Sequence, residues 1–145
     1  MKAPLQLGQS IVRREDARLL TGRGRYTDDT VPAGTAAVLF VRSPYAHARL
    51  NGIDAAAAAA APGVVAVFTG RDLEADGVGH LPTVSEIKDE AGNRHREPRH
   101  LPMAPDKARH VGDIVAMIVA DTLDRARDAA ELLEIDYEPL PAVVT

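Results

Sequence analysis

The eight residues DIVAMIVA (Asp113–Ala120) decide the fold that this sequence predicts. Five of them are large and apolar, and they occupy both of the faces that alternate along an extended chain, which is typical of a strand buried on both sides. Asp121 and Thr122 follow, and both carry acceptor side chains that commonly begin helices. The apolar stripe of that helix consists of Leu123, Ala126, Ala130 and Leu133. Glu134–Glu138 then alternates acidic with apolar residues, as a half-exposed strand does.

The part of the chain before this stretch supplies the elements that pack with it. Mainly apolar or β-branched runs predict strands at Thr35–Arg42 and Val64–Thr69, the first of them buried. A further strand is expected at Lys107–His110, joined at Gly112 to the strand that follows. Asp54 is followed by seven alanines, Ala55–Ala61, and then by Pro-Gly, so we expect a short helix with an N-cap and a stop. A further turn of helix is expected at Gly70–Leu73. The order of these elements predicts an α+β fold, with a few helices packed on one mixed sheet.

Two segments lack a long periodic pattern, although we expect residues 1–145 to form a single domain. Residues 1–34 are polar and rich in turn formers, which predicts an extended arm with one short helix at Glu15–Leu20. Residues 74–105 contain four prolines, three glycines and many charges. We therefore expect a long loop that is mobile in the isolated chain.

The composition excludes several classes of protein. The chain has no cysteine, so it holds no disulfide, no thiolate metal site and no cysteine-ligated iron–sulfur cluster. Its net charge of −4 argues against binding to nucleic acid, because phosphate neutralisation needs a surplus of Lys and Arg. No segment approaches the roughly 20 apolar residues of a membrane span, and no signal peptide is visible. We expect a soluble, cytoplasmic protein.

No set of residues in the sequence forms a catalytic or metal-binding pattern. Gly22-Arg23-Gly24 lacks the third glycine and the preceding strand of a nucleotide-binding loop, so a turn is the better interpretation. The five histidines do not repeat at helical spacing, which favours structural or surface roles over a metal site. The serines lack the Gly-x-Ser-x-Gly context of a nucleophile.

Three motifs nevertheless resemble a known family in their order and separation. They are TGRGRYTDD at residues 21–29, SPYAHAR at 43–49 and DYEPLPAV at 136–143. Supporting segments are Ile53-Asp54, PGVVAV at 62–67 and VGDIVA at 111–116. Together they resemble the N-terminal part of the molybdopterin-binding large subunit of the xanthine dehydrogenase, aldehyde oxidase and carbon monoxide dehydrogenase family, with TGRGRY favouring the carbon monoxide dehydrogenase-like branch.

The resemblance implies an α/β-hammerhead domain that serves as a structural module of a molybdenum-containing oxidoreductase. The family's chemistry uses molybdopterin-bound molybdenum, with iron–sulfur clusters and FAD carrying the electrons onward. The implied partners are the molybdenum-binding domains of the same large subunit and the iron–sulfur and FAD subunits or domains. No catalytic residue and no cofactor ligand carries over to this chain. Arg23, Arg25, Tyr26 and His47 are the residues expected at interfaces, and His47 is also expected to lock a turn by hydrogen bonding to backbone.

We expect an excised domain, inactive by itself, rather than a separately encoded fragment that completes an enzyme. The alternative function is a stand-alone small-ligand or protein-interaction module built on the same fold. A closed apolar pocket would favour that alternative, whereas a flat apolar face would favour the structural module. Such a face would make the isolated chain self-associate, and the expected candidates are the leucines, Ile11 and Val12 of the arm and Leu140–Val144.

Overall fold

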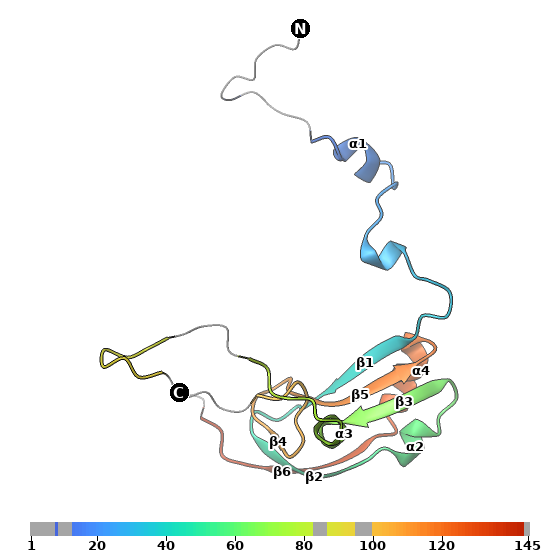
Figure 1. Cartoon of the computed structure of the whole chain (residues 1–145). Helices are drawn as coiled ribbons and strands as arrows, with labels where there is room; N and C mark the ends of the chain where they lie inside the picture. The colour runs from blue at the N-terminus through green and yellow to red at the C-terminus, as the bar shows by residue number, and fades with distance from the viewer. Residues whose placement is uncertain (1–7, 9–12, 83–86, 95–99, 144–145) are drawn as a thin grey trace. The chain divides into compact units, whose positions relative to one another are not determined.

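The computed structural model describes Gly8 and residues 13–82, 87–94 and 100–143 (Figure 1). The chain divides into two units, Met1–Thr35 and Ala36–Thr145. The first unit contains α1 (Asp16–Leu19) and a single 3-10 turn, η1 (Thr27–Asp29). The short helix expected at residues 15–20 is confirmed by α1.

The end of α1 is fixed by local hydrogen bonds. Gly22 has a φ of +68°, which an L-residue rarely adopts, and this turn lets the Arg23 N–H donate to the Arg18 carbonyl at 2.9 Å. The Thr21 hydroxyl donates to the Ala17 carbonyl at 2.7 Å. The glycine at position 22 therefore serves backbone geometry, as the sequence predicts.

The second unit contains two three-stranded sheets. Sheet A has the order β1-β5-β3, from β1 (Ala37–Arg42), β5 (Ile114–Ala120) and β3 (Val64–Thr69). Sheet B has the order β4-β2-β6, from β4 (Lys107–Ala108), β2 (Ala48–Asp54) and β6 (Glu134–Pro139). All the strand pairs are antiparallel, so the prediction of one mixed sheet is wrong, although the α+β class is confirmed.

The strand predictions differ from the structure at three places. β2 was not predicted, because Asn51-Gly52 has the composition of a turn. In the structure this pair of residues lies at a register shift in the pairing of β2 with β6, between Leu50 and Gly52. β4 is only two residues long and pairs with β2 in sheet B, while β5 lies in sheet A. β1 is an edge strand with alternating exposure rather than a buried one. β5 lies at the centre of its sheet, as its apolar run predicts.

Three helices complete this unit. They are α2 (Ala56–Ala59), α3 (Gly70–Ala75) and α4 (Leu123–Ala130), each close to its predicted position. Asp54 caps α2 from one residue before the N-cap position, since its carboxylate accepts from the Ala56 N–H at 2.9 Å. Thr122 is the N-cap of α4 and accepts from the Arg125 N–H at 3.3 Å.

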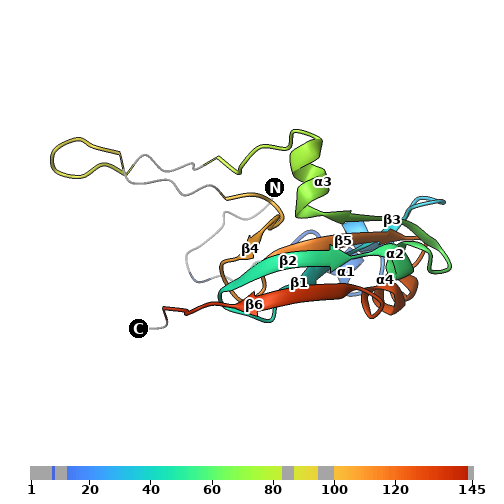
Figure 2. The same cartoon turned by 90° about the horizontal axis from the view of Figure 1, so that it is seen from below.

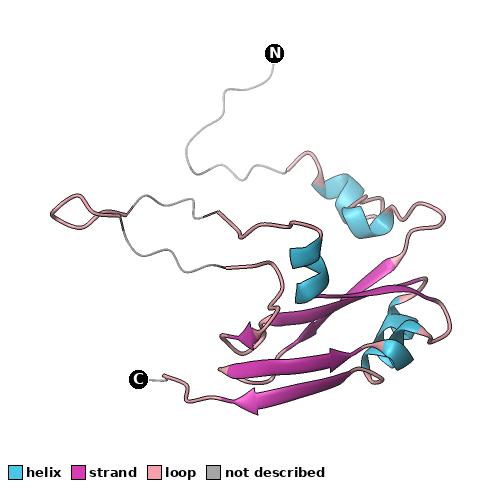
Figure 3. Cartoon of the chain, turned by 60° about the horizontal axis from the view of Figure 1, so that its bottom comes forward, coloured by secondary structure: helices cyan, strands magenta, loops and turns pink. Residues whose placement is uncertain are grey.

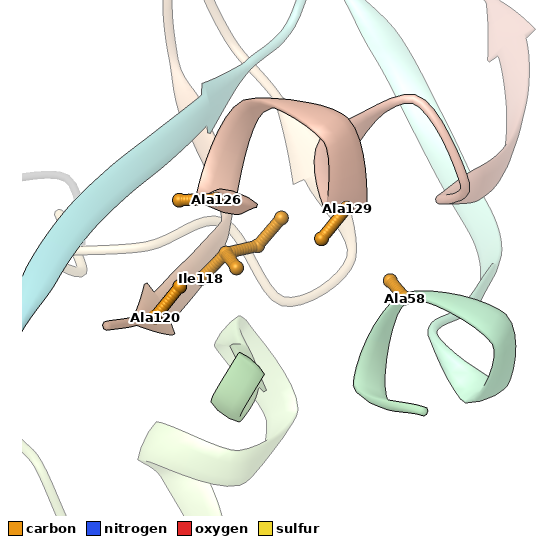
Figure 4. Packing of buried hydrophobic residues seen from close by; sticks show 5 residues of the cluster. All are labelled: Ala58, Ile118, Ala120, Ala126 and Ala129. Atoms are coloured by element: carbon orange, nitrogen blue, oxygen red, sulfur yellow. The ribbon is translucent and has the colours of Figure 1, made fainter. Parts of the chain in front are cut away.

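The first core cluster lies where α2 and α4 meet sheet A (Figure 4). Its fully buried members are Ala58, Ile118, Ala120, Ala126 and Ala129. Four of these five are alanines, whose small side chains let the helices lie close to β5. The buried stripe of α4 therefore runs through Ala126 and Ala129, and Leu123, predicted to belong to it, is 41% exposed.

The second core cluster lies between the two sheets, which form two layers (Figures 2 and 3). Leu50 of β2 and Val115 of β5 are buried there with Ala104. Val41, Ile53, Ile135 and Tyr137 pack around them. Sheet B thus covers part of one face of sheet A, and α2 and α4 cover the rest of that face.

The segment predicted as a long loop, 74–105, is packed at its described ends. Glu74 and Ala75 belong to α3, and Met103 and Ala104 are only 3% and 4% exposed. Between them Lys88 pairs with Arg94 in an isolated bridge. Residues 83–86 and 95–99 lie outside the described residues, so mobility of the middle of the loop stays a prediction.

Candidate functional site

The SPYAHAR motif forms the connection from β1 to β2, and its first residue is fixed to the turn before β5. Ser43 is 2% exposed. Its N–H donates to the Asp113 carbonyl at 2.8 Å, and its carbonyl accepts from the Gly112 N–H at 2.9 Å. The Ser43 hydroxyl also lies 3.1 Å from both the N–H and the carbonyl of Tyr45. The motif therefore joins the two sheets through backbone hydrogen bonds.

Two tyrosines pack beside this connection. The rings of Tyr45 and Tyr137 have centroids 5.0 Å apart and are tilted by 48°, an arrangement that favours aromatic attraction. The Tyr137 hydroxyl is buried and has no hydrogen-bond partner among the described residues. Burial raises the pKa of Tyr137, and the nearby Ser43 hydroxyl, already bonded to the Tyr45 backbone, opposes the rise only in part. A neutral, structural tyrosine results.

His47 ties the β1–β2 connection to the chain that follows β6. Its Nδ1 lies 2.7 Å from the Pro141 carbonyl, and its own carbonyl accepts from the Leu140 N–H at 2.9 Å. Because a carbonyl can only accept, the proton of this hydrogen bond must be on Nδ1. The predicted backbone hydrogen bond is present, but its partner is 94 residues away in sequence rather than in the adjacent turn. Its interface role stays a prediction.

Arg23, Arg25 and Tyr26 belong to the first unit. Tyr26 is 66% exposed, and its N–H donates to the Asp29 carboxylate at 2.9 Å. Gly24 lies between Leu19 and Tyr26: a Cβ there would be 3.1 Å from a Leu19 methyl and 3.4 Å from the Tyr26 ring. Both arginines are exposed. His47 belongs to the second unit, and the interface roles of all four residues stay predictions.

The pocket of interest in the second unit lies between the start of α3 and the segment leading into β5. Its volume is about 360 Å³. It is lined by Arg71, Glu74, His100, Leu101, Ala104, Pro105, Asp106, Arg109, His110 and Asp113. Seven of these ten residues are ionisable, although most of the surface that lines the pocket is apolar.

The least exposed ionisable group in the pocket is Asp113, which is 9% exposed. Its carboxylate accepts from the Arg109 N–H at 2.9 Å, which closes the turn between β4 and β5. The Arg109 guanidinium donates to the Lys107 carbonyl and lies 3.8 Å from the Asp106 carboxylate. The sequence analysis assigned no role to Asp113. Its position, a carboxylate directly before a buried strand, is the feature that could have indicated its role in the turn. These bonds build the loop between β4 and β5.

No group of three His, Asp or Glu side chains within residues 13–82, 87–94 and 100–143 could hold a metal ion. No described helix is long and apolar enough to cross a membrane.

Comparison with known proteins places this geometry in a family. Residues 21–141 match the family model "Aldehyde oxidase and xanthine dehydrogenase, a/b hammerhead domain". The chain belongs to this family. The match confirms the α/β-hammerhead fold that the three motifs imply.

The hammerhead domain has relatives in enzymes that are named for different substrates. The nicotine 6-hydroxylase large subunit of Paenarthrobacter nicotinovorans is 39% identical over 95% of this chain and 16% of that protein. The xanthine dehydrogenase molybdenum-binding subunit of Escherichia coli O157:H7 is 40% identical over 87% and 16%. The crystal structure of quinoline 2-oxidoreductase from Pseudomonas putida 86 superposes with a TM-score of 0.83 at 42% identity, over 94% of this chain and 16% of that one. The chain therefore spans about one sixth of the length of these relatives.

Proposed function

We propose that this hammerhead domain is a structural module of the large subunit of a molybdenum-containing hydroxylase or dehydrogenase. The observation that carries the proposal is the match of nearly the whole chain to one sixth of such subunits. On this proposal the module contributes shape and contacts, and the parent enzyme's redox chemistry takes place on other domains and subunits.

This chain lacks the cysteine ligands that iron–sulfur clusters use. No described cluster of His, Asp or Glu could bind a metal. The pocket around Asp113 is shaped by internal hydrogen bonds of the β4–β5 turn. We therefore assign no step of the reaction to this chain, and we place the molybdenum, the iron–sulfur clusters and the FAD on its partners.

A structural module has to present its neighbours with fixed surfaces, and the His47 contacts supply one. They bind the chain after β6 to the β1–β2 connection through a side-chain and a backbone hydrogen bond. The path of residues 139–141 is then held by the body of the module rather than left to a free terminal strand.

The alternative, a stand-alone binding module, rests on the pocket. A drug-sized ligand site is mostly apolar with a few polar groups. This pocket has a mostly apolar lining, but it is partly open rather than closed. The match of nearly the whole chain to one region of such large subunits outweighs it. The structural module is the better supported function.

The test uses the protein in its native host, with an affinity tag added to the gene that encodes this sequence. We expect the purified tagged protein to carry molybdenum in stoichiometric amount, measured by elemental analysis, together with molybdenum-binding sequence identified by mass spectrometry. The isolated 145-residue chain, produced separately, is the control and should carry neither molybdenum nor flavin. Recovery of the tagged protein without molybdenum would refute the proposal.

A further inference from the structure

The outward faces of the two sheets differ in chemistry. On sheet B the outward side chains of β6 are Glu134, Asp136 and Glu138, which alternate with inward ones, and Arg49 of β2 lies 3.4 Å from the Glu138 carboxylate. This is the pattern of an antiparallel sheet whose outer face meets water. Sheet A does not have it.

On sheet A the face away from sheet B and α4 is apolar across all three strands. It consists of Val38, Phe40, Met117, Val119, Ala66 and Phe68, which we call the outer face of sheet A. Cross-strand pairing arranges it in two rows, Val38–Val119–Ala66 and Phe40–Met117–Phe68. The opposite face carries Leu39, Val41, Val67 and Ile118, the residues of the first core cluster and its surroundings.

The side chains of the outer face of sheet A are accessible in this chain. Val38 is 45% exposed and Phe40 is 44% exposed, and the other four are partly buried. Val65, the extra residue at the register shift in β3, is 69% exposed beside them. Large contiguous apolar surfaces are where proteins commonly bind other polypeptides, and this face carries two phenylalanines.

We propose that the outer face of sheet A is the surface on which the rest of the large-subunit polypeptide packs. This inference rests on the proposed function and specifies it. The argument for this occupant is length: the matched region is only 16% of the relatives' chains, which leaves five sixths of such a subunit to be accommodated. The acidic outer face of sheet B is left as the solvent side.

The outer face of sheet A lies outside the segments that the sequence named as candidates, the arm and Leu140–Val144. Leu20 and Val143 of those segments are 85% and 94% exposed. Leu5, Leu7, Ile11, Val12 and Val144 lie outside the described residues, so the expectation for them stays a prediction.

The absence of native cysteine makes this inference directly testable. Phe40→Cys and Val38→Cys are introduced separately into the tagged gene in the native host and into the isolated chain. Each thiol is then labelled with a maleimide, and the rate is followed by mass spectrometry on the peptide that contains it. Asn51→Cys, on exposed β2 backbone of sheet B, gives the rate of a freely accessible thiol in the isolated chain. Thermal melts of the isolated variants check that they fold.

We expect all three thiols to react at similar rates in the isolated chain. In the purified complex the labelling rate of the thiols at positions 38 and 40 should fall by about tenfold or more, because the core of an interface excludes solvent and reagent. Unchanged reactivity in a complex that contains molybdenum would overturn this inference and leave the proposed function standing. Protection that appears in the isolated chain as its concentration rises would identify a second copy as the occupant, and would also overturn it. A tagged protein without molybdenum would refute the proposed function, and this inference with it.

Discussion

The imidazole of His47 and the carbonyl of Pro141 are joined by a 2.7 Å hydrogen bond across 94 residues of sequence. The bond connects the β1–β2 connection, which runs from sheet A to sheet B, to the residues that follow β6. It acts together with the Leu140 N–H, which donates to the His47 carbonyl.

Replacing His47 by alanine should lower the free energy of unfolding by about 1 kcal/mol, the net value of a typical hydrogen bond. The change should also speed hydrogen exchange at the Leu140 amide, since the segment loses one of two attachments. Thermal melts and exchange mass spectrometry measure both effects. His80→Ala is the control, because the His80 ring bonds to the carbonyl of the adjacent Leu81 rather than to a distant segment. Equal effects of the two substitutions would contradict the role given to His47.

Gly70 is required for the contact between α3 and the end of the long loop. A Cβ at this position would lie 2.5 Å from the Ala104 carbonyl group and 2.6 Å from the Pro105 nitrogen, which are backbone atoms that cannot rotate away. Gly70→Ala should therefore destabilise the fold by about 1–3 kcal/mol through overpacking. Gly52→Ala is the matched control, since nothing lies within 4 Å of a Cβ there. Chemical denaturation of both variants measures the difference in their free energies of unfolding. A Gly70→Ala protein as stable as Gly52→Ala would show that the backbone at Ala104 and Pro105 can shift without cost.

Two neighbouring alanines of α2 separate helix propensity from packing. Ala58 is fully buried in the first core cluster, whereas Ala59 is exposed. Ala58→Leu should destabilise the protein by about 1–3 kcal/mol because the added side chain has no room beside α4. Ala59→Leu should change stability by no more than about 0.5 kcal/mol. If both variants have the same melting temperature, close packing of α2 is not what stabilises this cluster.

Acid should weaken the start of α3. The Thr69 hydroxyl and N–H both donate to one Asp72 carboxylate oxygen at 2.7 Å, and these bonds, the hydroxyl one foremost, lower the pKa of Asp72. Since the folded pKa lies below the unfolded value of about 3.9, the stabilisation is complete above that value and is lost as the pH falls through the folded pKa.

Asp72→Asn removes this titration. Between about pH 6 and pH 3 its melting temperature should fall less than that of the unmodified protein. Asp76→Asn removes a carboxylate at the other end of the same helix and is the control. The assignment fails if the two variants show the same dependence on pH.

The sequence was most informative where local pattern and burial agree. The apolar run of β5, the acid-alternating β6 and the capped α4 all lie where they were predicted, because each has a period that its packing requires. β2 was missed because its middle holds Asn51 and Gly52, residues whose strand conformation depends on pairing with β6. Division into two sheets follows from pairings between distant segments, which no local pattern records.

The candidate sites were predictable to a smaller extent. A backbone hydrogen bond from His47 was predicted from its motif, but the partner, Pro141, could not be, because the contact depends on how sheet B assembles. The pocket around Asp113 was not predicted, since it requires the close approach of Gly70 to Ala104. The outer face of sheet A was hidden in the sequence, because both faces of β1 and β5 are apolar and only the packing shows which one is left uncovered.

The order of the strands has a consequence for how the protein is made. The central strand of sheet A is β5, and β1 and β3 pair only with it, so neither can join a sheet before the ribosome has released residues 114–120. Sheet B waits in the same way for β4 and β6. Pairing of segments so far apart is slow, and intermediates that expose apolar strands are prone to aggregate. During synthesis, the nascent chain therefore displays Leu39 and Val41, which pack on the first core cluster in the folded domain, until β5 is available. We expect chaperones to bind the chain at this stage.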